Sequence, residues 1–300
     1  MLKKVITIFF SISLIFLLNN SNTASANTED DDVVDEFAGK PIIVYGGSLD
    51  NTQKEETKRL LGSENEAIDE LDVTGVDLAN YIGGNPNANM YSSVKITFKE
   101  KGHGIKTDIV TEDNITKVTS DMYTNALLTA GVTDALVEIA SPIKVTGESA
   151  LTGIYKAYDI EGQDLDPERM KVATEELEVS TKLADEGLSN EEVASLIAEI
   201  KKELAENESL SREEIEKLVD DKTIQLNIEL DMNDKQMLVD LFDKIKELDI
   251  DFDEIKNQLI DVSGTLKDKL EDQLEDVDTD SLLEKIKNFF KELFNFFTKL

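Results

Sequence analysis

The sequence contains no cysteine and no tryptophan, and only one histidine, His103, among its 300 residues. Without cysteine there is no disulfide framework, no thiolate metal site and no attachment point for a lipid on an N-terminal cysteine. A single histidine excludes metal sites built from several histidines, and any Ser-His-Asp triad would depend on a residue that stands between two glycines. The lack of tryptophan argues against the aromatic platforms that hold sugar rings in many polysaccharide-cleaving enzymes.

Basic residues are also scarce relative to acidic ones. The chain has 31 Lys and Arg against 64 Asp and Glu, which gives a formal net charge of -33. Phosphate binding needs a basic face, so we expect no nucleic-acid partner. An excess of carboxylates instead favours solubility and weak, diffuse binding of cations. The hydrophobic content of 40% is still sufficient for a folded core.

Residues 1–26 have the pattern of a secretory signal peptide. Two lysines near the start are followed by an apolar run at 5–18 and by Ala-Ser-Ala at 24–26. This run is shorter than the about 20 residues that span a bilayer, and small residues stand where a signal peptidase cuts. We therefore expect cleavage after residue 26, export, and a mature chain without a transmembrane span. Residues 27–39 are acidic and poor in apolar residues, which predicts a flexible terminus.

Residues 40–163 mix strand and helix patterns, which predicts an α/β domain. Strands are expected at 41–45, 91–100, 104–110 and 135–139, and helices at 50–61, 75–82, 120–131 and 147–158. The Lys-Gly-His-Gly stretch at 101–104 favours a hairpin turn between the second and third of these strands. Alternation of strands with helices indicates a sheet covered by helices.

Residues 164–300 carry helical patterns almost throughout. Capping motifs predict helix starts at Asp166, Ser189, Ser211 and Ser281. An apolar stripe with a spacing near 3.5 residues runs through 252–270. Residues 223–230 alternate like a strand and are interpreted as an extended connector. The predicted fold class is α+β: an N-terminal mixed sheet-and-helix domain (40–163), then an acidic all-α helical bundle or region of long hairpins (164–300).

Several short blocks in the middle of the chain resemble a known family. They are Gly102-His103-Gly104-Ile105, Asn114-Ile115-Thr116, Thr129-Ala130-Gly131, Val145-Thr146-Gly147 and Ala150-Leu151-Thr152-Gly153. These blocks are similar to the YpuA-like family of secreted Gram-positive, Bacillus-type proteins, a domain of unknown function. The resemblance covers most of the mature chain, more loosely in the acidic helical half. It implies an extracellular or cell-envelope setting and brings no catalytic residues.

No constellation in the sequence identifies a catalytic site. The stretch Gly-Glu-Ser-Ala-Leu at 147–151 begins like a nucleophile elbow but lacks the final glycine, and no histidine follows it. We instead expect Ser149 in the first turn of a helix capped by Thr146, and His103 in a turn. We predict no catalytic residue and no cofactor. A carboxylate-based extracellular hydrolase acting on cell-wall material stays open as an alternative, because carboxylates are abundant.

The best candidate for a metal site is an aspartate triplet, Asp249, Asp251 and Asp253. Its spacing copies the first three ligand positions of a calcium loop. The sixth position, however, is Glu254 where glycine is needed, and the twelfth is Ile260 where glutamate is needed. An acidic first turn of a helix explains the same pattern through the helix dipole. Weak divalent-cation binding, and with it an acidic cation-binding role for the protein, therefore stays an alternative.

Residues 281–300 form the sharpest local signal, an amphipathic helix with ten large apolar residues on one face and lysines on the other. The residues expected to make a partner or membrane contact are Phe289, Phe290, Leu293, Phe296 and Phe297. One interpretation is docking on an envelope protein or a membrane surface, and the other is packing on the chain's own bundle. The leading hypothesis is an exported, envelope-associated binding or scaffold protein.

Overall fold

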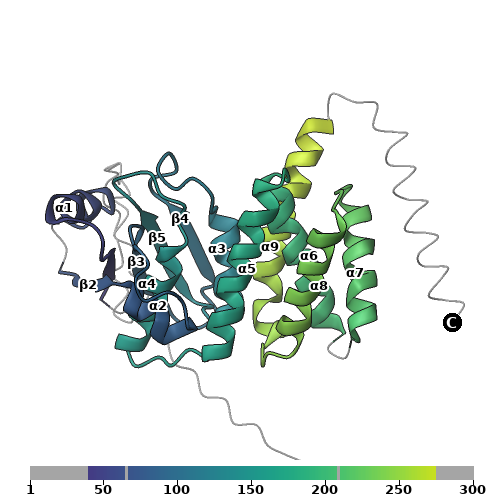
Figure 1. Ribbon diagram of the computed structural model, residues 1–300, viewed down its shortest axis with the longest axis horizontal. Coiled ribbons are helices and arrows are strands. Elements are labelled where there is room, and N and C mark those ends of the chain that lie inside the picture. The colour runs from purple at the N-terminus through teal and green to yellow at the C-terminus, as the bar shows by residue number, and fades with distance from the viewer. Residues whose placement is uncertain (1–39, 65–66, 208–209, 275–300) are drawn as a thin grey trace, which may run out of the picture. The chain divides into compact units, whose positions relative to one another are not determined.

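The computed structural model describes residues 40–64, 67–207 and 210–274 (Figure 1). The strands are β1 (Ile42–Gly46), β2 (Asp69–Val73), β3 (Ser93–Phe98), β4 (Ile105–Ile109) and β5 (Ala135–Ala140). The helices are α1 (Asn51–Leu60), α2 (Gly75–Ile82), α3 (Ser120–Ala130), α4 (Ser149–Ile160), α5 (Pro167–Asp185), α6 (Asn190–Glu206), α7 (Arg212–Gln225), α8 (Met232–Lys246) and α9 (Phe252–Leu274). The predicted α+β class is confirmed, with the strands in the N-terminal region and helices after it. The predicted signal peptide (1–26), acidic terminus (27–39) and C-terminal helix (281–300) lie outside the described residues.

The strands form one five-stranded sheet in the order β2-β1-β3-β5-β4. β1 is parallel to β2 and β4 is parallel to β5, whereas β3 is antiparallel to both of its neighbours. The predicted hairpin between the strands around 91–100 and 104–110 is therefore wrong, because β5 lies between β3 and β4.

The turn at 101–104 carries the chain past the start of β5. The backbone N–H of Lys99 donates to the carbonyl of Asp134 at 3.1 Å. The Asp134 carboxylate accepts hydrogen bonds from the N–H of Gly102 at 2.9 Å and of Gly104 at 2.8 Å. Both glycines have left-handed φ values, +91° and +81°, which glycine adopts without strain. The turn is thus fastened to the residue just before β5, and β5 pairs beside β3.

Strand β2 was not predicted, because its sequence is acidic rather than apolar. It pairs with β1, and its carboxylates are held by lysines of α1 on the same face of the sheet. Lys58 Nζ lies 2.6 Å from a Glu70 oxygen, and Lys54 Nζ lies 2.6 Å from an Asp72 oxygen. Ion pairs with a covering helix, together with one parallel neighbour, thus hold a strand that carries little apolar surface.

The opposite face of the sheet carries the main hydrophobic core. α4 packs on β1 and β3, and α3 packs on β4 (Figure 1). The apolar side chains that point toward these helices are fully buried: Val44, Val94, Ile96, Val137 and Ile139. Gly153 lets α4 approach closely, since a β-carbon there would lie only 3.1 Å from Val94 Cγ1.

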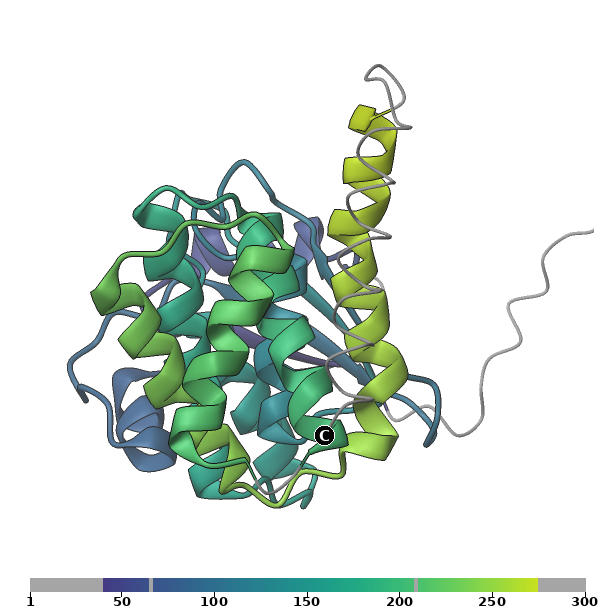
Figure 2. The ribbon, with the colours of Figure 1, turned by 90° about the vertical axis from the view of Figure 1, so that its right-hand side faces the viewer.

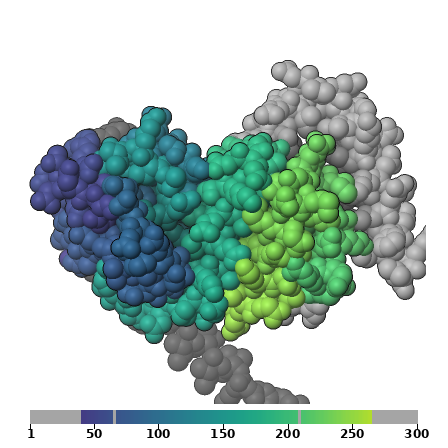
Figure 3. Space-filling model, viewed as in Figure 1, coloured from purple at the N-terminus to yellow at the C-terminus, as the bar shows by residue number. Residues whose placement is uncertain are grey.

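Helix α5 joins the sheet region to the later helices. It packs on α2 and α3 on one side and on α6 and α8 on the other. Buried apolar residues from both regions form one continuous cluster. On the outside, the space-filling view shows atoms of the sheet region touching atoms of the later helices (Figure 3). Whether 40–163 and 164–300 fold independently stays a prediction. In the described part of the chain, no helix is both long and apolar enough to traverse a bilayer.

Local sequence signals place most of the helix starts correctly. Ser189 and Ser211 each form the predicted capping box, and Asp166 caps α5 ahead of Pro167. The predicted connector at 223–230 is wrong at its start, because α7 continues to Gln225. Within it, the Ile224 side chain is 68% exposed. Its apolar alternation therefore does not reflect a buried strand face.

Asp234 gives the stability of the protein a predicted pH dependence. Its side chain, near the start of α8, is only 7% exposed, and its Oδ1 has no hydrogen-bond partner in the described part of the chain. Burial, then the neighbouring Glu186 carboxyl, raises the pKa of Asp234 to about 6. The folded state therefore binds the proton of the Asp234 carboxyl more tightly than the unfolded state does. The contribution of this protonated carboxyl to the stability of the fold is complete below about pH 4 and is lost as the pH rises through 6.

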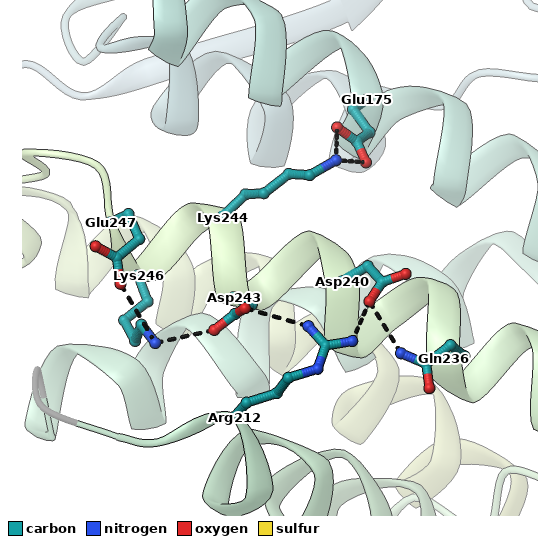
Figure 4. A network of polar contacts seen from close by, with 8 residues as sticks. All are labelled: Glu175, Arg212, Gln236, Asp240, Asp243, Lys244, Lys246 and Glu247. Atoms are coloured by element: carbon teal, nitrogen blue, oxygen red, sulfur yellow. Dashed lines mark hydrogen bonds and ion pairs between the residues drawn. The ribbon is translucent and has the colours of Figure 1, made fainter.

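We accordingly expect Asp234→Asn to increase the free energy of unfolding at pH 7.5 by about 1–3 kcal/mol and to have little effect at pH 4.5. Urea unfolding at the two pH values measures this. Asp240, on the same helix, provides the control: hydrogen bonding to Arg212 lowers the pKa of Asp240 (Figure 4). Asp240→Asn should therefore not stabilise the protein at pH 7.5. An Asp234→Asn effect that is equal at both pH values would contradict the assignment.

Candidate functional site

A cavity of about 670 Å³ lies between the outer edge of β4, the first half of α3 and one face of α9. We call it the β4–α9 groove. Its lining comprises residues 101–107, Asp121, Thr124, Thr133, Asp134, Glu254, Asn257, Gln258, Asp261 and Val262. Figure 2 shows α9 standing beside the sheet. Its volume falls within the range of about 300–1,000 Å³ that is usual for ligand sites.

One face of α9 forms the far wall of the groove. The lining residues share a face of the helix, because Asn257 and Gln258 lie three and four positions after Glu254, and Asp261 lies four and three positions after them. The neighbouring stripe of Ile255, Leu259 and Val262 is buried against Leu128, Ala194 and Ala198 of α3 and α6. Apolar packing therefore fixes α9 while its polar face is turned to the groove.

The Gln258 side chain connects the two walls at one end. Its Oε1 accepts a hydrogen bond from the backbone N–H of Ile105 at 2.6 Å. Its Nε2 donates to the carbonyl of Thr133 at 3.3 Å. Lys101 Nζ, from the adjoining turn, lies 2.9 Å from a Glu254 oxygen. These contacts hold α9 against the turn at 101–105.

His103 lies in the turn at this end of the groove, where it lines the cavity. Its side chain is exposed, and its Nδ1 is 2.8 Å from the carbonyl oxygen of Gly104. The ring thus contacts its own turn, and the expected turn position of His103 agrees with the structure. Deeper along the groove, the hydroxyl oxygens of Thr107 and Thr124 are 3.1 Å apart.

The lining is polar and carries more acid than base. Its carboxylates belong to Asp121, Asp134, Glu254 and Asp261, and its lysines are Lys101 and Lys106. With His103 neutral, the formal charge is 2 - 4 = -2. Asp134 already accepts two backbone N–H groups, and Glu254 pairs with Lys101. The cavity is therefore surrounded by hydrogen-bond acceptors, the carboxylates, and by hydrogen-bond donors, the lysines. This lining suits recognition of a polar ligand.

We expect Asp134→Ala to destabilise the protein by about 1–3 kcal/mol, because the N–H groups of Gly102 and Gly104 lose their shared acceptor. Hydrogen exchange at these two amides should accelerate more than exchange in α4. The matched control is Asp113→Ala, which removes an exposed carboxylate from a different turn. Equal exchange at Gly102 and Gly104 in both variants would rule out the anchoring role of Asp134.

Ser149 has a structural position. Its Oγ accepts hydrogen bonds from the backbone N–H of Ser92 at 3.1 Å and of Tyr91 at 3.3 Å, and it lies 2.6 Å from Ser92 Oγ. It thereby fastens the start of α4 to the residues before β3. The predicted cap Thr146 is wrong, since its hydroxyl bonds the Glu148 carboxylate and Glu148 precedes α4 with no side-chain cap.

The aspartate triplet surrounds the start of α9. Asp251 Oδ1 accepts a hydrogen bond from the N–H of Glu254 at 3.1 Å, and the carbonyl of Asp249 accepts one from Arg169 at 3.1 Å. Among the described residues, no three or more His, Asp or Glu side chains are grouped so that they could hold a metal ion. Cation binding at Asp249, Asp251 and Asp253 stays a prediction. The predicted contact residues between Phe289 and Phe297 lie outside the described residues.

Sequence reasoning singled out His103 but missed the rest of the groove. Ile105 and Gln258 are 153 positions apart, and nothing in either local pattern indicates that they meet. The Gly102–Ile105 block in the family resemblance was the one signal that pointed to this part of the molecule. Polar residues on the outer face of an amphipathic helix, such as Asn257 and Gln258, are otherwise ordinary.

Comparison with known proteins identifies the family but no activity. The chain is similar to the uncharacterized protein YpuA of Bacillus subtilis strain 168, with 34% identity over 270 residues, which cover 88% of this chain and 90% of that protein. No solved structure matches the chain. The family model described as "Protein of unknown function (DUF1002)" matches residues 45–262, an interval that contains every residue of the groove lining. The chain belongs to this DUF1002 family of proteins of unknown function.

Proposed function

We propose that the protein is an exported, envelope-associated binding protein, that the β4–α9 groove is its ligand site, and that it acts without catalysis. The groove is the observation that carries this proposal. Its best-placed polar groups are occupied in building the walls: Asp134 anchors the turn, Gln258 joins α9 to β4, and Glu254 pairs with Lys101. Side chains whose polar groups hold the walls of the groove together support a binding role rather than a catalytic one.

The sequence supplies the setting for this function. The pattern of residues 1–26 supports export. The amphipathic segment 281–300, with Phe289 and its apolar neighbours, is proposed to retain the protein at a membrane surface or an envelope protein. The net charge of -33 opposes a role with nucleic acid.

Cell fractionation tests the setting, and cross-linking tests the groove. The exported protein should begin at Asn27 and be found in the envelope fraction. Asn257→Trp places a large ring in the groove, whereas Ile260→Trp places it on the side of the same helix that does not line the groove, where Ile260 is 43% exposed. We expect cross-links to envelope material to be lost in Asn257→Trp and kept in Ile260→Trp. A cytoplasmic, uncleaved protein, or equal cross-linking by both variants, would refute the proposal.

A further inference from the structure

We infer that the β4–α9 groove takes an extended polypeptide segment that carries basic residues and adds to the sheet as a further strand beside β4. This inference rests on the proposed binding function of the groove and names its ligand class. Addition of a strand to an open sheet edge is a general mode of peptide recognition, in which main-chain hydrogen bonds supply affinity.

The first observation is that β4 is the last strand of the sheet among the residues that the structure describes, and its outer side faces the groove. The sheet order ends at β4, and β4 pairs with β5. The N–H of Val110 donates to the carbonyl of Ile139 at 2.8 Å. Because successive N–H groups of a strand point to opposite sides, the even-numbered residues here face β5. Thr107 and Ile109 therefore direct their backbone groups outward, as an edge strand does.

The second observation is that α9 already supplies one strand-like partner at this edge. The Gln258 carboxamide has the same donor and acceptor as a peptide group, and its Oε1 accepts the outward N–H of Ile105 at 2.6 Å. The groove lining then continues to Thr107, Asp121 and Asp261. Cavity space therefore remains beside β4 beyond the position that Gln258 fills, and an entering backbone there meets the next outward N–H, that of Thr107.

The third observation is the charge of the lining, which selects the occupant. The lining has four carboxylates against two lysines, a formal net charge of -2, and the whole chain has -33. A basic segment is attracted by this field and an acidic one is repelled. A second copy of this chain fits less well, because its own β4 would arrive with another α9 and the same excess of acid.

Synthetic peptides provide the probe. We would titrate the capped peptide Lys-Val-Thr-Val-Lys-Val-Thr-Val-Lys into the protein by calorimetry, with a version in which Glu replaces Lys. Two further versions carry N-methyl groups on alternate amides, one on each edge of the extended peptide. We expect the basic peptide to bind, the acidic one to bind at least about tenfold more weakly, and only one of the two methylated versions to lose binding by about tenfold or more.

Thr107→Pro tests the edge itself. It removes the outward N–H of Thr107 but leaves the ladder from even-numbered residues to β5, which is the position on an edge strand where proline is tolerated. Thr107→Val keeps the N–H and removes only the hydroxyl. We expect Thr107→Pro to weaken peptide binding by about tenfold or more, and Thr107→Val by less than about threefold. If Thr107→Pro fails to fold, the two methylated peptides still test strand addition, because they are titrated into the unsubstituted protein.

Three results would overturn the inference: no binding of any peptide at millimolar concentration, equal binding to Thr107→Pro, or equal loss with both methylation patterns. If envelope cross-linking still depends on Asn257 in that case, the proposed function stands and the groove takes a small polar ligand instead. If the peptide binds but Asn257→Trp does not change cross-linking to envelope material, the edge of β4 binds peptide strands and the proposed envelope function fails.

Discussion

Replacing Lys201 by methionine is expected to lower the free energy of unfolding by about 3–5 kcal/mol, because it leaves a buried carboxylate without its counter-charge. Lys201 Nζ lies 2.6 Å from Glu176 Oε1 and 2.7 Å from the carbonyl of Asn125. The other oxygen of Glu176 accepts the Thr129 hydroxyl at 2.6 Å. The side chains of Lys201 and Glu176 are 1% and 0% exposed. Burial lowers the pKa of Lys201, against the attraction of Glu176.

Two further variants, Glu176→Leu and the double variant with Lys201→Met, separate two quantities. One is the free-energy cost of leaving a buried charge unpaired, and the other is the net contribution of the ion pair to stability. Glu176→Leu alone should be about as damaging as Lys201→Met. The double variant should recover most of the loss, because two apolar residues in a dry site replace two charges that were costly to desolvate. Urea unfolding of the three variants gives the coupling energy. A double variant whose loss equals the sum of the single losses would contradict this interpretation.

Arg169→Met is expected to lower the free energy of unfolding by about 2–4 kcal/mol, because three carbonyls lose a charged donor. The guanidinium of Arg169, on α5, donates to the carbonyl of Thr129 at 2.8 Å and to that of Leu128 at 3.1 Å. It also donates to the carbonyl of Asp249 at 3.1 Å, just before α9 begins. One side chain thus joins the end of α3 to the start of α9, and these two helices form walls of the groove.

The effect should therefore be stability loss combined with local opening. Hydrogen exchange at Ile255 and Leu259 should accelerate in Arg169→Met more than exchange in α4. Arg169→Lys should recover only part of the loss, since an ammonium does not reproduce the planar fork that reaches three acceptors. Full recovery with lysine, or uniform acceleration of exchange in α4 and α9, would show that Arg169 has no specific role at the start of α9.

The helices of this protein follow from local signals, whereas the order of the strands does not. Helix starts are predicted at Asp166, Ser189 and Ser211, because the side chain of a capping residue bonds backbone N–H groups only two or three positions later. β5 pairs with both β3 and β4, and Asp134, just before it, bonds the turn at 101–104 through a contact between residues 30 or more positions apart. A Gly-x-Gly turn favours a hairpin on its own, and neither the pairing of β5 nor the contact with Asp134 is indicated by the residues of the turn.

The groove could not be predicted from the sequence, because it too is formed by contacts between residues far apart in the chain. Gln258 looks like any exposed residue of an amphipathic helix until Ile105 is placed beside it. The aspartate triplet was noticed because its spacing is local, and the position of Asp251 beside the N–H of Glu254 fits the helix-terminus interpretation that the sequence also allowed. Local patterns identified elements here, and long-range contacts built the site.

The separation of the two groove walls along the chain has a consequence for synthesis. β4 is complete at Ile109, but the helix beside its free side begins only at Phe252. A chain made from its N-terminus can pair β4 with β5 long before α9 exists. During that interval the outer side of β4 is a bare template for intermolecular pairing. A nascent or prematurely ended chain that stops before 252 should therefore be aggregation-prone, even though its whole sheet is present.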